Sequence, residues 1–243
     1  MPKRCHVLNM SEFNIATWNI RKCVGLDRRR DPHRVARIIA GLEADVVALQ
    51  EADKRLGHRP AALTPDLIDN ETDLKIADAG GHESSIGWHG NALLLKSDLE
   101  VVQRHSLHLP GFEPRGALIF DISGRDRSFR VVGVHLGLLR ASRRAQLAAI
   151  RSHLDALIPM PTIVLGDFNE WSNAGGLEPL VGFEVHSPGR SFHAARPVAA
   201  LDRIALDDQG ELLDAGVVET RETKVASDHL PVWGRVRVGK SAA

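Results

Sequence analysis

A buried strand that ends on polar residues is the first chemical feature of this sequence. The segment 163–171, IVLGDFNEW, runs three apolar residues into a glycine and then carries a carboxylate and an amide two positions apart. Because strand residues alternate between the two faces of a sheet, Asp167 and Asn169 are expected to face the same point in space. The ends of buried strands are common places for catalytic groups in α/β proteins. An aspartate or asparagine after a strand is also a frequent turn former, so this pair alone fixes no function.

The same pattern recurs at the ends of other apolar runs. These positions hold carboxylates, imidazoles, amides and an arginine: Asn19, Glu51, Asn91, Arg115, His135, Asp167, Asn169, Asp202, Asp228 and His229. Carboxylates gathered in one pocket repel each other, and a divalent cation removes that cost. Oxygen ligands from Asp, Glu and Asn indicate Mg²⁺, with Mn²⁺ as a substitute, rather than zinc. Histidine beside aspartate adds an oriented proton acceptor or donor, and this inventory suits phosphoryl chemistry.

The elements that would position these residues are mostly strands. Gly, Pro, Asp and Asn separate eight runs of β-type composition, at residues 13–20, 45–51, 91–96, 116–122, 129–136, 162–168, 201–206 and 232–238. Two segments predict helices: 31–42, with Asp31 as the cap and Pro32 in the first turn, and 142–157, with Ser142 as the cap. Each helix precedes a strand, whereas elsewhere strand follows strand. The pattern predicts an α/β protein with two packed mixed sheets and helices outside them.

Composition sets the broad class. In 243 residues there is no repeat, low-complexity tract or linker, which predicts a single domain over 1–243 with a core at about 13–238. Lysine plus arginine equals aspartate plus glutamate at 31 each, so a strongly basic nucleic-acid footprint is missing. Basic clusters remain at 27–34 and 140–144, and most such clusters are solvated surface. Cys5 and Cys23 suggest neither a disulfide framework nor a thiolate zinc site.

The start of the sequence lacks the apolar core of a signal peptide, and no apolar run approaches membrane-spanning length. A cytoplasmic protein without a transmembrane segment is therefore expected. Its oligomeric state stays open at this point.

Eight short motifs, taken in order, resemble those of the endonuclease/exonuclease/phosphatase superfamily. They are TWNIR, LQE, GNALLL, RGALI, VHLG, GDFNE, LDRI and SDHLPV, and the resemblance covers roughly residues 13 to 238. Any one motif is weak, but GDFN followed by LDRI and SDHLPV is a strong joint signal. The resemblance implies a deoxyribonuclease-like fold, which is a four-layered α/β sandwich, and metal-dependent hydrolysis of phosphoesters.

The resemblance also implies a metal site. Glu51, in the QE motif, looks like the principal Mg²⁺ ligand, with Asn19 beside it. Asp228, in the terminal SDH motif, belongs to the same expected group. Asp167 would orient or deprotonate the attacking water, or hold a second metal.

The remaining motif residues are implied to handle phosphate and protons. His229 would contact the phosphate or act as a base, with Asp202 fixing its ring, and Asn169 would bind the phosphate. His135 would be a phosphate ligand or the acid for the leaving oxygen. Supporting contacts to the phosphate or to these groups are expected from Asn91, Arg115 and Arg21. Arg21 and Lys22 could touch a substrate backbone, although a solvated loop is the more frequent case.

The substrate is open between two classes. The abasic-site endonucleases keep a tyrosine where this chain has His135, and the chain has no tyrosine at all. The nearest resemblance is to short bacterial members that carry GDFN followed by Asp or Glu and Trp, and a pair like Ser191–Phe192 before LDRI. One hypothesis is a nuclease acting on DNA or RNA by in-line attack of water. The alternative is a phospholipid or small-molecule phosphodiesterase or phosphatase, and a binding module without activity is the third hypothesis.

Overall fold

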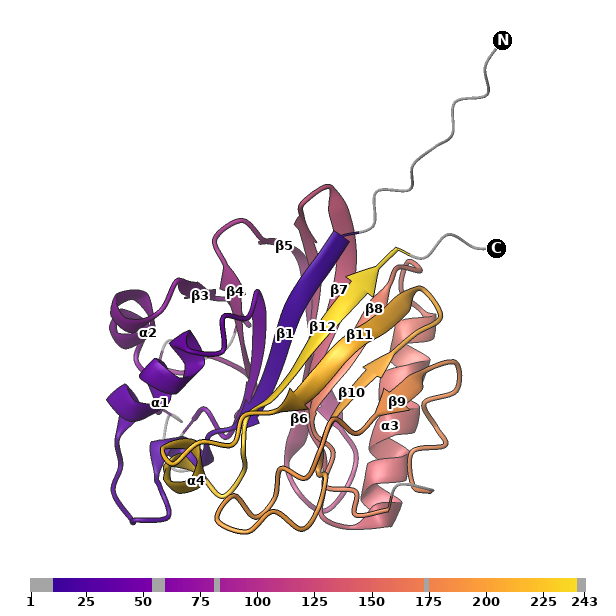
Figure 1. Ribbon diagram of the computed structural model, residues 1–243. Helices are drawn as coiled ribbons and strands as arrows, with labels where there is room; N and C mark the ends of the chain where they lie inside the picture. The colour runs from indigo at the N-terminus through magenta and orange to yellow at the C-terminus, as the bar shows by residue number, and fades with distance from the viewer. Residues whose placement is uncertain (1–10, 54–59, 81–83, 173–174, 240–243) are drawn as a thin grey trace.

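The computed structural model describes residues 11–53, 60–80, 84–172 and 175–239, so Cys5 lies outside the described residues. Within these ranges the strands form two six-stranded sheets (Figure 1). The first sheet has the order β11-β12-β1-β2-β4-β3. Its strands are β1 (Ser11–Asn19), β2 (Val46–Gln50), β3 (Leu74–Ile76), β4 (Ala92–Lys96), β11 (Gly210–Val217) and β12 (Val232–Val238).

The second sheet has the order β5-β6-β7-β8-β10-β9. Its strands are β5 (Glu100–Leu109), β6 (Arg115–Gly124), β7 (Arg127–His135), β8 (Thr162–Asp167), β9 (Glu184–His186) and β10 (Asp202–Leu206). Each sheet contains one parallel pair, β1 with β2 and β7 with β8, among antiparallel neighbours. Both sheets are therefore mixed, as the sequence predicts.

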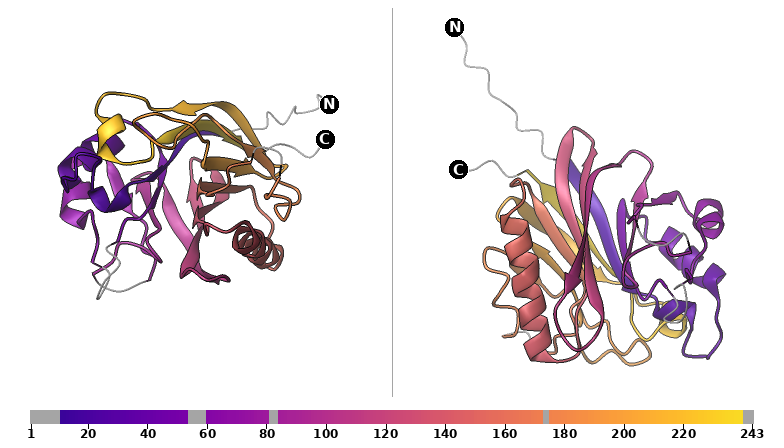
Figure 2. Two further views of the ribbon diagram at one scale, coloured as in Figure 1. Left: turned by 90° about the horizontal axis from the view of Figure 1, so that it is seen from below. Right: turned by 180° about the vertical axis from the view of Figure 1, so that it is seen from behind.

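Three apolar layers follow from the alternation along these strands. Phe13 and Ile15 of β1 face Phe129 and Val131 of β7 in the core between the sheets. The opposite faces of the two sheets pack against helices, one sheet on α1 (Pro32–Ala40) and α2 (Pro65–Glu71), the other on α3 (Arg140–Asp155). Seen from below, the helices lie on opposite outer sides of the sheets (Figure 2). The predicted four-layered sandwich is confirmed.

Two short elements complete the described helices: η1 (Arg21–Cys23) and α4 (Thr223–Ala226). None of the helices in the described part of the chain has the length and apolar character needed to cross a membrane. The Cys23 thiol is buried and donates to the Ala62 carbonyl at 3.6 Å.

The predicted helix caps have different outcomes. Asp31 accepts a hydrogen bond from the Arg34 N–H at 2.9 Å and caps α1, as expected. Ser142 was expected to cap the second helix, and this is wrong: α3 begins at Arg140, so Ser142 lies inside its first turn. The helix starts earlier because the Arg143 N–H donates to the Leu139 carbonyl at 3.0 Å. The Arg143 guanidinium also donates to the carbonyls of the two residues before Leu139, at 3.2 and 2.6 Å.

Strand register places the polar ends in one row. In the second sheet, His135 at the end of β7 pairs with Asp167 at the end of β8, and Asp167 pairs with Asp202 at the start of β10. In the first sheet, Asn19 at the end of β1 pairs with Gln50, the last residue of β2. Each sheet thus presents its polar residues at the ends of neighbouring strands.

Candidate active site

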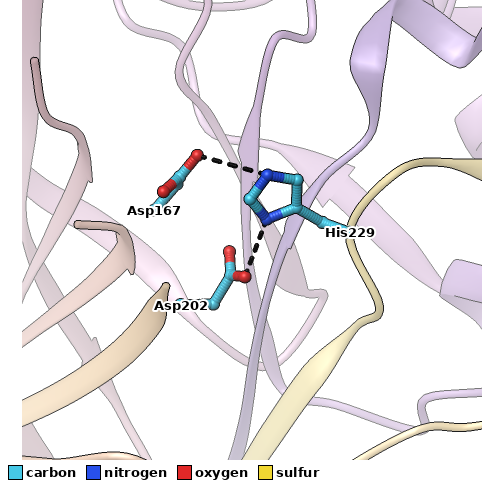
Figure 3. A group of neighbouring side chains, drawn as sticks. All are labelled: Asp167, Asp202 and His229. Atoms are coloured by element: carbon cyan, nitrogen blue, oxygen red, sulfur yellow. Dashed lines mark hydrogen bonds and ion pairs between the residues drawn. The ribbon is translucent and has the colours of Figure 1, made fainter. Parts of the chain in front are cut away.

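A histidine between two aspartates forms the centre of the site (Figure 3). His229 Nδ1 lies 2.8 Å from Asp202 Oδ2, and His229 Nε2 lies 3.7 Å from Asp167 Oδ2. All three side chains are buried. Burial opposes the charged form of His229, but the charges of Asp202 and Asp167 outweigh it and raise the pKa of His229 to about 10. For Asp167 burial has the opposite sign: it disfavours the charged carboxylate and raises the pKa of Asp167 to about 6.

His229 reaches this position from the loop that precedes β12. Its carbonyl accepts a hydrogen bond from Trp18 Nε1 at 2.8 Å, which ties the loop to β1. Ser227 Oγ donates to the Asn19 carbonyl at 2.7 Å and accepts from the His229 N–H at 3.3 Å. Trp18 and Ser227 therefore hold the loop against the end of β1. The motif resemblance implied no role for either side chain.

Ser191 and Phe192 contact the Asp202–His229 pair, Ser191 at Asp202 and Phe192 at His229. Ser191 Oγ donates to Asp202 Oδ2 at 2.5 Å, on the same oxygen that faces His229. The Phe192 ring lies 5.0 Å from the His229 ring, centroid to centroid. From the sequence alone, the Ser191–Phe192 pair indicated only a resemblance to short bacterial members of the superfamily. Its position shortly before LDRI was the available signal, but the contacts themselves follow from the fold.

One oxygen of Asp167 is the meeting point of the two sheets. Asp167 Oδ2 accepts a hydrogen bond from Asn19 Nδ2 at 3.1 Å and lies 3.4 Å from His135 Nε2. The same oxygen faces His229 Nε2. Three polar side chains from separate parts of the chain therefore converge on a single carboxylate oxygen.

Asn169 lies close to Asp167 for a different reason than the sequence predicts. Strand β8 ends at Asp167, so strand alternation does not extend to Asn169. The chain turns instead, with a left-handed φ of 51° at Asn169, and the Asn169 N–H donates to Asp167 Oδ1 at 2.9 Å. Asn169 Nδ2 donates to the Leu136 carbonyl at 2.9 Å. The turn thus fixes both the aspartate and the strand next to it.

Glu51 follows β2 and has a left-handed backbone, with φ of 53°. Its carboxylate forms an ion pair with the Lys22 ammonium. Both residues line a pocket of about 350 Å³ that also has His135 in its wall. The described residues that line it are Lys22, Glu51, Asp53, His89, Gly90, Glu113, Pro114, Arg115, His135 and Leu138. Lys22 is therefore part of the site rather than of a solvated loop.

The other predicted residues have partners of their own, and of them Arg115 is the one among the described residues that lines this pocket. Asp228 Oδ2 lies 3.6 Å from Arg21 Nε, and the Arg21 guanidinium also donates to backbone carbonyls of its own loop. Asn91 is buried, and its amide nitrogen donates at 2.9 Å to a backbone carbonyl of β6. Arg115 lines the pocket and pairs with Glu113 at 3.0 Å.

Two places could hold a divalent cation. The ligand atoms of Asp167, Asp202 and His229 lie within 4.8 Å of one another. There, however, the imidazole stands between both carboxylates and, when protonated, supplies the positive charge itself. At Glu51 the structure already places a cation, the Lys22 ammonium, against the carboxylate. Asn19 pairs with Gln50, the residue before Glu51, and its amide oxygen accepts from the Arg21 N–H at 3.1 Å. Carboxylate and amide oxygens are ligands of the type that suits a hard cation such as Mg²⁺.

Known proteins resemble this chain in sequence or in fold. "Uncharacterized protein YbhP" of Escherichia coli (strain K12) is 27% identical over an alignment of 245 positions, which covers 93% of this chain and 96% of the relative. An endonuclease/exonuclease/phosphatase family protein from Bacteroides thetaiotaomicron superposes with a TM-score of 0.75 at 16% identity, covering 95% of this chain and 99% of that one.

Two further solved structures carry named activities or ligands. The Danio rerio (D. rerio) TDP2 complexed with single strand DNA product has a TM-score of 0.69 at 17% identity and covers 93% of this chain and 99% of its own. The Bacteroides thetaiotaomicron mannosyl-6-phosphatase Bt3783 has a TM-score of 0.70 at 16% identity, covering 92% and 99%. The sequence model of the Endonuclease/Exonuclease/phosphatase family matches residues 16–229, nearly the whole described chain. The chain belongs to this family of phosphoester hydrolases.

Proposed function

We propose that this phosphoester hydrolase is a Mg²⁺-dependent phosphodiesterase in which a water molecule attacks phosphorus in line with the leaving oxygen. The observation that carries the proposal is the convergence on Asp167 Oδ2. Asn19, His135 and His229 all face this oxygen, and the pocket that contains His135 also contains Glu51. An oriented carboxylate, imidazoles and a cation site are the groups that phosphoryl transfer requires.

The residues take separate roles in this proposal. Asp202 accepts from His229 Nδ1, so the other ring nitrogen points toward Asp167 and the space where a phosphate oxygen would bind. Asp167 orients the attacking water and accepts its proton. His135, in the pocket wall, donates a proton to the leaving oxygen.

Binding and charge neutralisation fall to the remaining groups. Mg²⁺, when bound at Glu51 and Asn19, neutralises charge on the phosphate, and Mn²⁺ is its expected substitute. Asp228 is a further candidate ligand, and Asp167 the candidate ligand for a second metal. Phosphate contacts are proposed for Asn91, Arg115, Asn169 and Arg21; Arg115 lines the pocket and Asn169 contacts Asp167.

Nucleic acid is the first substrate candidate. Its support is the family and the likeness to a protein solved with a single strand DNA product. The basic cluster at 140–144 adds less than the sequence suggested, because Arg140 and Arg143 both bind the buried Glu170 carboxylate and Arg144 pairs with Glu178. Phosphate contacts by this chain would come instead from arginines nearer the site, such as Arg115.

A phospholipid is the second candidate, favoured by an apolar rim beside the pocket. Phe112 is 92% exposed, Leu138 66% and Leu139 54%. The two loops that carry them are joined by a hydrogen bond from the Leu138 N–H to Glu113 at 3.0 Å, and both Glu113 and Leu138 line the pocket. Exposed apolar groups around a reactive pocket suit a substrate with acyl chains.

Hydrolysis assays separate these candidates. We expect the protein to hydrolyse bis-p-nitrophenyl phosphate with Mg²⁺ or Mn²⁺, to lose this activity in EDTA, and to lose it in a folded His229→Ala variant. Supercoiled DNA, single-stranded RNA and phosphatidylglycerol vesicles, tested in parallel under the same metal conditions, identify the substrate class. A folded protein that hydrolyses none of these phosphodiesters with any divalent metal would contradict the proposal.

A further inference from the structure

Lys22 occupies the pocket in a way that the motif does not explain. Its ammonium contacts Glu51 Oε2, and the two side chains are only 22% and 18% exposed. An exposed ion pair adds little to stability, because both charges are well solvated and the long side chains lose freedom. This pair is instead largely enclosed, at the carboxylate that the proposed function assigns to the metal.

The backbone holds Lys22 in this position from both sides. The Lys22 N–H donates to the Glu51 carbonyl at 3.0 Å, and its own carbonyl accepts from Arg30 Nη1 at 2.7 Å. The backbone of Lys22 is also left-handed, with φ of 56°. A non-glycine residue in this region persists only where its surroundings hold it, and such positions cluster at functional sites. These contacts hold the loop in the conformation that places the Lys22 side chain against Glu51.

A metal at Glu51 and the ammonium at Glu51 exclude each other. The ammonium contacts Glu51 Oε2, and a divalent ion on the same carboxylate would lie next to it in a partly dehydrated pocket, where like charges repel strongly. We therefore expect binding of a divalent ion to release Lys22 from Glu51. The pocket wall also holds three groups that can donate to an anion, Arg115, His89 and His135, beside the carboxylates of Asp53 and Glu113.

We propose that Lys22 is a specificity-determining residue that couples metal binding to phosphate binding. In the metal-free protein its ammonium neutralises Glu51; when a divalent cation takes Glu51, the ammonium turns to a non-bridging oxygen of the substrate phosphate. Lys22 thus weakens binding of the metal alone and strengthens binding of the metal together with phosphate. The proposal rests on the proposed function, because it takes Glu51 to be the metal ligand.

Coupling of this kind is reciprocal and measurable. If metal binding frees Lys22 for phosphate, phosphate must tighten metal binding by the same factor. A static salt bridge that only supports the fold makes neither prediction. Removing it would lower stability without raising metal affinity.

Titration with Mn²⁺, followed by the electron paramagnetic resonance of the free ion, tests this without reference to turnover. The proteins are the unmodified chain, Lys22→Met and, as a matched control, Lys224→Met, which removes another paired lysine outside the pocket. Each is titrated with and without inorganic phosphate. We expect Lys22→Met to bind Mn²⁺ alone about tenfold more tightly and to lose the tightening caused by phosphate. Lys224→Met should behave as the unmodified chain.

Two further variants keep the test decisive. Lys22→Gly suits the left-handed backbone, so it replaces Lys22→Met if that variant unfolds. Glu51→Gln tests the underlying metal assignment. If Glu51→Gln leaves Mn²⁺ affinity unchanged, both the metal assignment and the role of Lys22 are wrong. If Glu51→Gln weakens Mn²⁺ binding but the folded Lys22 variants do not strengthen it, only the role of Lys22 is wrong.

Discussion

At the scale of single residues, the sequence predicts which chemical groups take part but not how the backbone presents them. Asn19, Asp167, Asp202 and His229 come together as the motifs suggest. The left-handed conformations of Glu51, Lys22 and Asn169 could not be predicted, because non-glycine residues rarely adopt them without support from distant contacts. The sequence named Lys22 only as a residue that could touch a substrate backbone, with a solvated loop as the more frequent case; its contact with Glu51 could not be predicted, because only the fold of the loop turns it there.

Asp202 provides a prediction at this scale. Changing Asp202 to asparagine keeps the size of the side chain but removes the charge that orients His229 Nδ1. We expect kcat to fall by about 10²–10⁴-fold, since the imidazole loses its fixed orientation and tautomer. The measurement is steady-state hydrolysis of bis-p-nitrophenyl phosphate.

The control for Asp202→Asn is Asp208→Asn, a change of an exposed aspartate beyond the same strand. It should leave kcat unchanged. An Asp202→Asn protein that keeps near-normal kcat would show that His229 needs no carboxylate partner.

At the scale of elements, all eight predicted strands are present, and both predicted helices. The sequence missed β3 and β9, which have three residues each and leave too short a pattern. It also missed β5, which is mostly exposed at the edge of its sheet, and β11, whose register is broken by a bulge at Leu212/Asp214. Edge strands and bulged strands lack the apolar alternation on which such predictions depend.

Gly166 tests how strand packing positions the catalytic carboxylate. It has φ of 148°, and a Cβ at this position would lie 2.0 Å from the Val134 carbonyl oxygen of β7. Gly166→Ala must push β8 away from β7, so we expect a loss of roughly 3 kcal/mol in the free energy of unfolding. Activity should fall as well, because Asp167 follows directly. Urea unfolding and hydrolysis assays provide the two measurements.

Gly41→Ala is the matched control for Gly166→Ala. Gly41 has a helical backbone and room for a Cβ, whose nearest neighbours would lie at 3.5 Å. This change should alter stability by less than about 1 kcal/mol. Equal effects of the two alanines would mean that close packing of β7 and β8 is not what Gly166 provides.

Glu170 links the loop after β8 to α3 and predicts a pH effect on stability. Burial alone would raise its pKa, but hydrogen bonds from the Ser172 N–H, Arg140 and Arg143 outweigh burial and lower the pKa of Glu170 to about 2. Because the folded-state pKa lies below the ordinary value of 4.5, this carboxylate stabilises the fold above about pH 4.5. That contribution is lost as the pH falls from 4.5 toward 2.

The corresponding variant is Glu170→Gln. At pH 7 we expect it to lower the free energy of unfolding by about 2 kcal/mol, and the difference from the unmodified chain should shrink as the pH falls below 4.5. Thermal unfolding at a series of pH values measures this. A difference that stays constant from pH 7 to pH 3 would rule out the charge of Glu170 as its cause.

At the scale of the whole molecule, the site exists only where the two sheets meet. The first sheet and its loops supply Asn19, Glu51 and His229, and the second supplies Asp167 and Asp202. The sequence could predict the layers from apolar patterns, because each pattern is local. It could not predict the pairing order of the strands, which depends on contacts between segments far apart in the chain. The single domain over 1–243 stays a prediction at this scale.

The proposed reaction requires a cation at Glu51 and a phosphate between Glu51 and the Asp167–His229 pair. A crystal structure with Mn²⁺ and a non-hydrolysable phosphodiester analogue tests this most directly, because anomalous scattering locates the metal without assumptions about the site. We predict a Mn²⁺ peak in contact with the Glu51 carboxylate, with phosphate oxygens within hydrogen-bond reach of His229. A single peak among Asp167, Asp202 and His229, with Glu51 still paired to Lys22, would contradict the account.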